Sequence, residues 1–308
     1  MPNTLAHIGL QGLLGRAVTP TADFKWVCLG CVIPDVPWIL QRIVSAGFTA
    51  SVVDPYDLRL YAIVQSSLIA CLVLSLAISL LSSAPRRVFM LLAFNSFVHL
   101  LLDAMETKWA NGVNLFAPFS WQLLNFGLWW PESNVVLGAT ICGALFLFYG
   151  WWRKPGQPVG LAAGLQTNTL VAMGLLAVYF ALPFLLMKGP EEANSHFVKT
   201  FRQRDQRAGK MVEFDRARVL QRSEATVLRM FTGEELTLLD TGGSKNGTFS
   251  VRGQFVDQNT VEAMEMHEHP PWLRDSASVL GLALIGLLWL QHLSTTLLPR
   301  ISLRRKPI

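Results

Sequence analysis

Residues 88–103 read VFMLLAFNSFVHLLLD, a strongly apolar stretch that carries a histidine and an aspartate four residues apart, His99 and Asp103. Residues i and i+4 share one face of an α-helix, so these two side chains should lie one turn apart. A charged group at the centre of a bilayer costs about 2.5–3.5 kcal/mol on insertion scales, so it normally needs a partner and marks a function. The stretch therefore predicts a membrane helix with a functional polar face.

Two other apolar stretches each carry one polar residue of the same kind. TLAHIGL (4–10) contains a histidine, and CVIPDVPW (31–38) contains an aspartate. Two imidazoles and two carboxylates form a common ligand set for a divalent transition metal. The candidate metal ligands are therefore His7, Asp35, His99 and Asp103.

The composition is that of a polytopic membrane protein. Of 308 residues, 51% are hydrophobic and only 15% are charged. The uncharged stretches long enough to span a bilayer are Leu60–Pro85, Asn134–Trp152, Pro155–Met187 and Ser276–Pro299. Trp26–Leu40 and Val88–Leu102 are apolar but interrupted, and Asn3–Leu14 should form a further short helix. We predict an all-α polytopic membrane helical bundle of about six hydrophobic helices.

Basic residues predict the orientation in the membrane. They concentrate at Arg86–Arg87, at Arg153–Lys154 and in the tail at Arg300, Arg304, Arg305 and Lys306. Positive charge favours the cytoplasmic side, which places the C-terminus in the cytoplasm. Ala104–Ser133 and Lys188–Asp275 should then lie outside. This distribution accounts for the net charge of +5 without nucleic acid as a partner.

The polar segment before the last apolar stretch has the pattern of a small β-rich domain. Residues 211–221, 226–233, 235–240 and 247–256 alternate apolar and polar side chains, as half-buried strands do. Ala193–Lys210 should form a charged helix or stalk. We therefore predict a membrane-embedded helical domain at 1–187 and an extracytoplasmic β-rich domain at 188–275. A last transmembrane helix with a basic cytoplasmic tail should follow at 276–308.

Each candidate ligand also has a structural explanation. His7 can simply bond a backbone carbonyl, and Asp35 can be the N-cap of a helix after Pro34. His99 and Asp103 can be a packing or proton-relay pair. Pro34 and Pro37 cannot both lie inside a regular helix, so the chain should break beside Asp35. All the structural explanations must hold at once to exclude a shared site.

The segments MPNTLAHIGLQGLL, GCVIPDVPW and HLLLDAMETKWANGVNLFAPFSW resemble, in order and spacing, the family of LexA-binding, inner-membrane-associated metal-dependent hydrolases. The resemblance covers residues 1–125 approximately. It implies metal-dependent hydrolysis in a helical domain of the bacterial inner membrane. It also implies that His7, Asp35, His99 and Asp103 occupy the ligand positions, with zinc as the expected metal.

The chain departs from that family at two places. Pro37 stands where the family often has a second acid, and Gln65-Ser66 stands where it often has a His-Ser pair. These losses indicate either a mononuclear site or a degenerate one that no longer binds metal. In an intact site, Asp103 or Glu106 would act as the general base for a metal-activated water.

Aromatic residues after the His-Asp stretch suit a membrane lipid or a lipid-linked substrate at the outer interface. They are Trp109, Phe116, Phe119 and Trp121. An interfacial anchoring belt explains them better than a substrate wall.

For three shorter motifs, a structural role is a better explanation than a functional one. Leu239–Phe249 resembles the signature of forkhead-associated phosphopeptide-binding domains, but its Asn246-Gly247 is a good hairpin turn. His267 and His269 fit an exposed linker before the last membrane helix. Cys28 and Cys31 fit small packing residues of a helix rather than a redox or metal pair.

Three functions compete at this point. The first is an integral-membrane, metal-dependent hydrolase acting near the extracytoplasmic leaflet, on an ester or phosphoester. The second is a non-catalytic membrane protein whose outer domain binds a partner. The third is a small transporter that uses Asp35, His99 and Asp103 as a proton or metal path, although paired inverted halves are not apparent.

Overall fold

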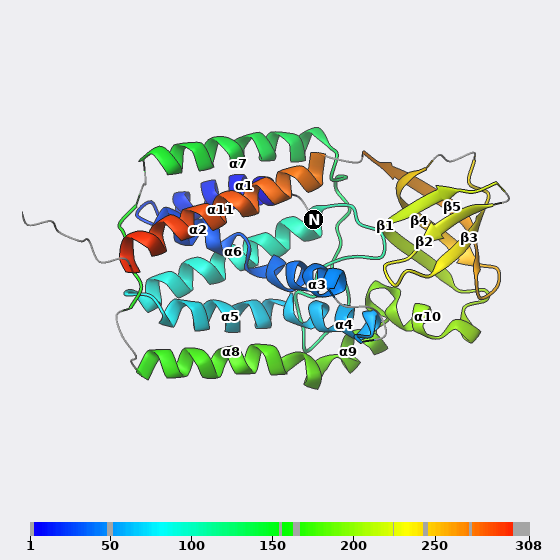
Figure 1. Ribbon diagram of the computed structural model, residues 1–308, viewed down its shortest axis with the longest axis horizontal. Helices are drawn as coiled ribbons and strands as arrows, with labels where there is room; N and C mark the ends of the chain where they lie inside the picture. The colour runs from blue at the N-terminus through cyan, green and yellow to red at the C-terminus, as the bar shows by residue number, and fades with distance from the viewer. Residues whose placement is uncertain are drawn as a thin grey trace, which may run out of the picture.

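The computed structural model describes residues 3–47, 52–153, 156–162, 167–223, 225–242, 246–270 and 273–297. A bundle of helices forms the larger part, and a five-stranded barrel lies at one end of it (Figure 1). The barrel strands precede the last helix in the chain, so the predicted combination of a helical part and a small β domain is confirmed. The basic tail that was predicted to be cytoplasmic, with its charges at 300–306, lies outside the described residues.

The helices of the bundle follow the apolar stretches of the sequence. They are α1 (Thr4–Val18), α2 (Phe24–Gly30), α3 (Val36–Gly47), α4 (Pro55–Gln65), α5 (Leu68–Leu80), α6 (Pro85–Met105), α7 (Asn134–Arg153), α8 (Thr167–Leu186) and α11 (Leu273–Leu297). Five helical segments in the described ranges are long and apolar enough to cross a membrane, or six if one bent pair counts as a span. The structure thus supports a membrane protein.

Two of these segments are broken where the sequence supplies a reason. A 3₁₀ turn, η1 (Ile33–Asp35), separates α2 from α3 at the predicted proline break. The stretch Leu60–Pro85 is not one straight helix, because α4 and α5 meet at 69°. At that bend the hydroxyls of Ser66 and Ser67 donate to carbonyls of the preceding turn, which competes with continuation of the helix.

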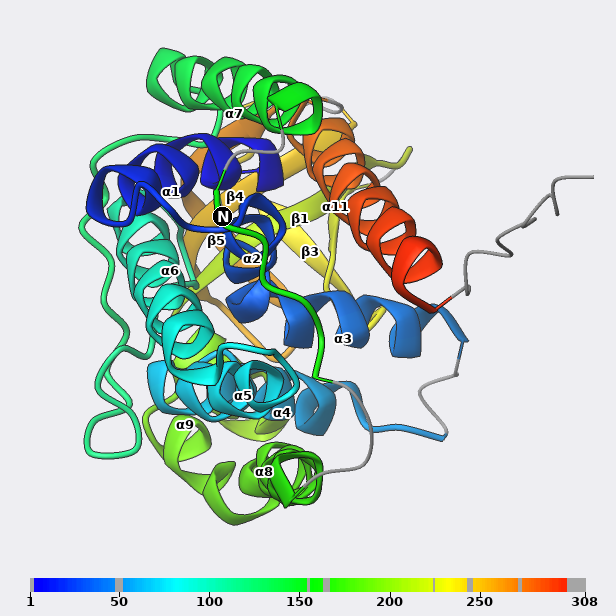
Figure 2. The same cartoon turned by 90° about the vertical axis from the view of Figure 1, so that its left-hand side faces the viewer.

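Glycines set the close packing of α1 on α7. A Cβ atom at Gly143 would lie 1.7 Å from the Leu5 carbonyl oxygen, and one at Gly9 would lie 2.5 Å from the Ala139 oxygen. Gly9 and Gly143 thus allow the two helices to approach closely. Helix α1 also contacts α6 and α11, as the view along the bundle shows (Figure 2). The N-terminal helix is therefore fixed against helices from the middle and the end of the chain.

The barrel is closed and follows the strand order β1-β2-β3-β5-β4. Its strands are β1 (Met211–Gln221), β2 (Thr226–Arg229), β3 (Glu235–Leu239), β4 (Gly247–Phe255) and β5 (Thr260–His269). Only β3 and β5 pair in parallel, and β1 pairs with β4 to complete the ring. Closure removes the exposed edges, and inward apolar residues such as Val219, Leu236 and Val251 fill the interior.

The segment between α8 and β1 is not the predicted continuous charged helix. It contains α9 (Lys188–Glu192), η2 (Ser195–Phe197), α10 (Val198–Arg202) and η3 (Arg204–Gln206). Asn194, His196 and Phe197 all have positive φ angles, which interrupt a right-handed helix. The prediction of a stalk was wrong for this reason.

Residues 106–133 form a loop without helices. The loop lies between the bundle and the barrel, where Asn111 Nδ2 donates to Asp215 Oδ2 at 2.9 Å. The Ala110 amide likewise donates to Glu213 Oε2 at 2.6 Å. The loop that follows α6 is therefore hydrogen-bonded directly to β1.

Candidate metal centre

His99 lies on α6 with a defined tautomer. Its Nδ1 atom is 2.9 Å from the carbonyl oxygen of Cys31, at the end of α2. A carbonyl only accepts hydrogen bonds, so Nδ1 carries the proton and donates. In the neutral ring this leaves a lone pair on Nε2, which is the arrangement of a histidine that binds a metal.

Two carboxylates face that lone pair. His99 Nε2 is 3.5 Å from Asp103 Oδ2 and 3.6 Å from Asp35 Oδ1. Both distances exceed an ordinary hydrogen bond. Because a lone pair and two anionic oxygens repel one another, the cluster requires a positive charge, supplied by a metal ion or by protonation of the ring.

His7 approaches the same aspartate from α1. The Asn3 side chain caps this helix by accepting from the Ala6 amide, and it donates to Thr140 on α7. His7 Nε2 is 3.4 Å from Asp103 Oδ1. Asp103 thus presents one oxygen to each histidine.

Gln11 holds the other side of the His7 ring. Its Nε2 is 2.9 Å from His7 Nδ1, and its Oε1 lacks a hydrogen-bond partner among the described residues. Exchange of the two amide atoms, which have the same shape, lets Oε1 accept from an Nδ1 proton. The His7 Nε2 lone pair then faces the aspartate, as in a metal ligand.

Three buried atoms of the candidate ligands lack a hydrogen-bond partner within the described chain, and Asp103 Oδ1 pairs with the ammonium group of Lys108. The three atoms are His7 Nε2, His99 Nε2 and Asp35 Oδ1. Unsatisfied buried polar atoms are rare and costly, so their convergence needs a cause. The recorded separations of 3.4–3.6 Å match the edge of about 3.4 Å between ligands that lie 2.0–2.1 Å from a tetrahedral zinc ion.

The four candidates are not equally close. His7, His99 and Asp103 form a group in which every ligand atom lies within 4.8 Å of the others, and Asp35 is outside that group. Asp35 is the last residue of η1 and lies directly before α3. The residues present fit a metal ion held by the group of three, with Asp35 beside it.

The two imidazole rings are stacked, with centroids 3.7 Å apart and planes within 2° of parallel. Their Nε2 lone pairs therefore lie in two parallel planes, which do not meet at one point. A single ion shared by His7 and His99 would draw the rings out of parallel.

Lys108 contacts the candidate site, although the sequence did not single it out. Its Nζ is 3.2 Å from Asp103 Oδ1 and 3.5 Å from Glu106 Oε2. Glu106 follows the last residue of α6 and has an extended backbone conformation. It therefore does not continue the face of α6 that carries His99 and Asp103. It is outside the close histidine-aspartate group and contacts that group through Lys108.

A second group of potential ligands joins the barrel to the bundle. Glu132 lies before α7, and His267 and His269 lie on β5. His269 Nδ1 bonds Glu132 Oε1 at 2.6 Å, and its Nε2 bonds Ser250 Oγ at 2.8 Å. Because both ring nitrogens of His269 have partners, we describe this group as a structural tether.

The expectation of an exposed linker at His267 and His269 was wrong. His269 is buried, and His267 stacks on Trp130 with centroids 3.7 Å apart. Alternation in β5 puts residues i and i+2 on one face of the sheet, which brings both histidines to Glu132.

The other sequence motifs contribute little to the centre. Cys28 and Cys31 are buried free thiols, and Cys31 Sγ donates to the Val27 carbonyl. Gln65 bonds the Tyr179 carbonyl, away from the histidines. Part of the predicted hairpin turn before Gly247, at residues 243–245, lies outside the described residues.

Sequence signals existed for some of the missed residues. Gln11 is four residues after His7 on one helix, so the spacing alone predicts contact. Lys108 lies beyond the end of α6, and only the path of the loop brings it back to Asp103.

Comparison with models of protein families, with curated proteins and with solved structures gave no match for this chain.

Proposed function

We propose that this chain is an integral-membrane, metal-dependent hydrolase whose metal is held by His7, His99 and Asp103, with Asp35 at the edge of the site. The observation that carries the proposal is that three buried polar atoms without hydrogen-bond partners in the described chain, one each from His7, His99 and Asp35, converge on Asp103. Zinc suits two imidazoles and carboxylates, and we take it as the metal.

The side chains around the metal would supply charge neutralisation and general-base catalysis. When bound, the cation supplies Lewis acidity and acidifies a water molecule beside it. Lys108 neutralises part of the carboxylate charge and pairs with the Asp103 oxygen that also faces His7. Glu106 is the candidate general base that is not committed to the ligand group, and Lys108 positions its carboxylate.

The placement of charges supports an orientation with the barrel outside. Arg86 and Arg87 begin α6, and Arg153 ends α7, all at the end of the bundle away from the barrel (Figure 1). Positive residues favour the cytoplasmic face. The metal centre, at the barrel end of α6, would then act near the outer leaflet of a bacterial inner membrane.

A non-catalytic alternative follows from the same geometry. Protonated His99 between Asp35 and Asp103 would also satisfy the charges, and the cluster would then be a structural ion pair within a membrane scaffold. Metal content separates the two possibilities.

The test is elemental analysis of the detergent-purified protein. We expect about one equivalent of zinc in the wild type and loss of most of it in His99→Ala and Asp103→Asn, because each substitution removes a donor. His292→Ala, on α11, serves as the control and should retain the metal. A wild type purified in the presence of zinc without stoichiometric metal would exclude the proposal, as would unchanged content in both ligand variants.

A further inference from the structure

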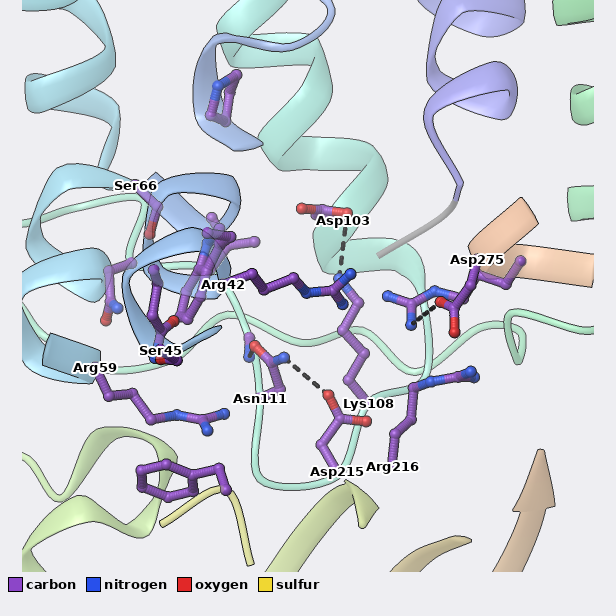
Figure 3. A pocket seen from close by; sticks show the side chains of 18 of the residues that line it. Arg42, Ser45, Arg59, Ser66, Asp103, Lys108, Asn111, Asp215, Arg216 and Asp275 are labelled. Carbon is purple, nitrogen blue, oxygen red and sulfur yellow. Dashed lines mark hydrogen bonds and ion pairs between the residues drawn. The ribbon is translucent and has the colours of Figure 1, made fainter. Parts of the chain in front are cut away.

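A cavity of about 690 Å³ lies between the bundle and the barrel (Figure 3). The bundle contributes Pro34, Arg42, Arg59 and Asp103 to its wall, and the barrel contributes Asp215 and Arg216. Asp103 is a ligand in the proposed metal centre, so whatever occupies the cavity lies next to that centre.

The wall of the cavity carries an excess of positive charge. Its basic residues are Arg42, Arg59, Lys108, Arg216 and Arg274, and its acidic residues are Asp103, Asp215 and Asp275. A metal ion bound to Asp103 would increase the excess further. Like charges around a confined space repel one another, so the arrangement favours an anionic occupant.

Three of the basic groups already have carboxylate neighbours. Lys108 is 3.2 Å from Asp103, Arg216 is 3.2 Å from Glu132, and Arg274 is 4.0 Å from Asp275. These pairs also involve Asp103 and Asp275, whereas Asp215 accepts from the neutral amide of Asn111 and its charge partly offsets that of Arg59. Arg42 and Arg59 are the basic groups of the wall that make no ion pair among the described residues.

Arg59 makes no ion pair in the described chain, although the charge of Asp215 acts on it. Its guanidinium lies 4.3 Å from the centroid of the Phe231 ring, and Nη2 is 3.5 Å from His196 Nδ1. Its buried Nε has no hydrogen-bond partner among the residues the structure describes. Arg42 also makes no ion pair among the described residues. Figure 3 shows its side chain directed toward Asp103.

Guanidinium groups bind tetrahedral oxyanions through parallel hydrogen bonds and suit phosphate particularly well. A neutral carboxylic ester would leave Arg42 and Arg59 without a function, whereas a phosphoryl group provides several charged oxygens. The position beside the metal centre indicates that this group is the one attacked, because metal ions and arginines together stabilise charge on a transferring phosphoryl group.

We propose that the cavity binds the phosphoryl group of the substrate and that Arg42 and Arg59 hold its oxygens, so that the bond cleaved belongs to a phosphoester. The proposal rests on the proposed function. In the overall step, water adds to phosphorus and the P–O bond to the alcohol breaks. The alcohol oxygen takes up the proton that water releases, so the step requires no oxidant or reductant.

The first experiment measures binding rather than turnover. Full-length protein in detergent, loaded with zinc, is dialysed to equilibrium against radiolabelled inorganic phosphate. We expect saturable binding in the wild type and at least about tenfold weaker binding in Arg59→Gln and Arg42→Gln, because each loses charge-assisted hydrogen bonds. Arg86→Gln, an exposed arginine at the opposite end of α6, is the matched control and should bind as the wild type does.

Absence of phosphate binding by the wild type overturns the proposal, as does equal binding by both cavity variants. Arg42 is exposed, so its variant tests the idea even where Arg59→Gln does not fold. Zinc bound without phosphate would refute this inference and leave the hydrolase proposal intact. Arginine-dependent phosphate binding without zinc would refute the metal centre and leave the anion site intact.

A competition experiment identifies the source of the phosphoryl group. Bound phosphate is challenged with phosphatidylcholine vesicles that contain phosphatidic acid, with p-nitrophenyl phosphate and with p-nitrophenyl acetate. Displacement by the phosphatidic acid vesicles alone assigns a lipid headgroup, and displacement by p-nitrophenyl phosphate assigns a soluble phosphoester. Displacement by the acetate as well, or by none of the three, contradicts the proposal.

Discussion

At the scale of single residues, the centre depends on what each imidazole contacts on its other side. The Cys31 carbonyl fixes the tautomer of His99, and the Gln11 amide lies against His7. Such outer contacts orient a ligand and raise its basicity. The two histidines are thus prepared for a cation by groups that would not touch it.

Gln11 gives a prediction at this scale. Gln11→Leu should weaken zinc affinity about 10- to 100-fold, because His7 Nδ1 loses its partner. Gln11→Glu retains an acceptor and should restore most of the affinity. Competition with a zinc-sensitive dye measures both variants, and equal affinity of Gln11→Leu and the wild type would show that His7 is not held through this contact.

At the scale of elements, the packing of α1 on α7 places His7. The two helices approach so closely at Gly143 that a methyl group there would overlap the Leu5 carbonyl. Small residues at helix interfaces have this role in membrane proteins. The position of one ligand is therefore set by a glycine on another helix.

Substitution of that glycine tests the link. Gly143→Ala should push α1 away from α7, destabilise the protein by about 1–3 kcal/mol and reduce zinc content through displacement of His7. Gly138→Ala, on the same helix with nothing within 4 Å of the added methyl group, is the control and should lose neither stability nor metal. Thermal unfolding and elemental analysis report the two effects, and identical behaviour of the two variants would disprove the coupling.

Elements with a clear local signal were predictable, and those determined by tertiary contacts were not. The alternation of residues 211–221 gave the bounds of β1, and Pro34 and Pro37 gave the break at η1. Strand β5 was missed because Glu262, Glu265 and Glu268 interrupt its apolar residues. The four candidate ligands could be named from the sequence because ionisable residues are rare in apolar segments. Lys108 and the cavity arginines depend on how the loop and the barrel return to the bundle, which no local pattern records.

At the scale of the whole molecule, the barrel closes one end of the bundle and forms one side of the cavity. Glu132 and His269 tether it, with Arg216 at 3.2 Å from the same carboxylate. Burial opposes the charged form of Glu132, but the hydrogen bond and charge of His269 and the charge of Arg216 outweigh it. They hold the pKa of this carboxyl below its usual value.

The tether predicts the response of the molecule to acid. A carboxylate with a lowered pKa in the folded state contributes stability above its ordinary pKa, and this stability is lost as the pH falls through the lowered value. The melting temperature of the wild type should therefore fall on acidification below pH about 4.5. Glu132→Gln should melt lower than the wild type at pH 7 and show a smaller acid dependence. Parallel pH profiles of the two proteins would show that the tether contributes nothing.

The contacts of α1 also bear on when the protein becomes competent during its biosynthesis. His7 leaves the ribosome long before α7 and α11, the helices against which its own helix rests. The nascent chain thus carries an incomplete chelator through most of its insertion. If the proposed centre binds zinc, the ion should be captured only after the later helices have entered the bilayer.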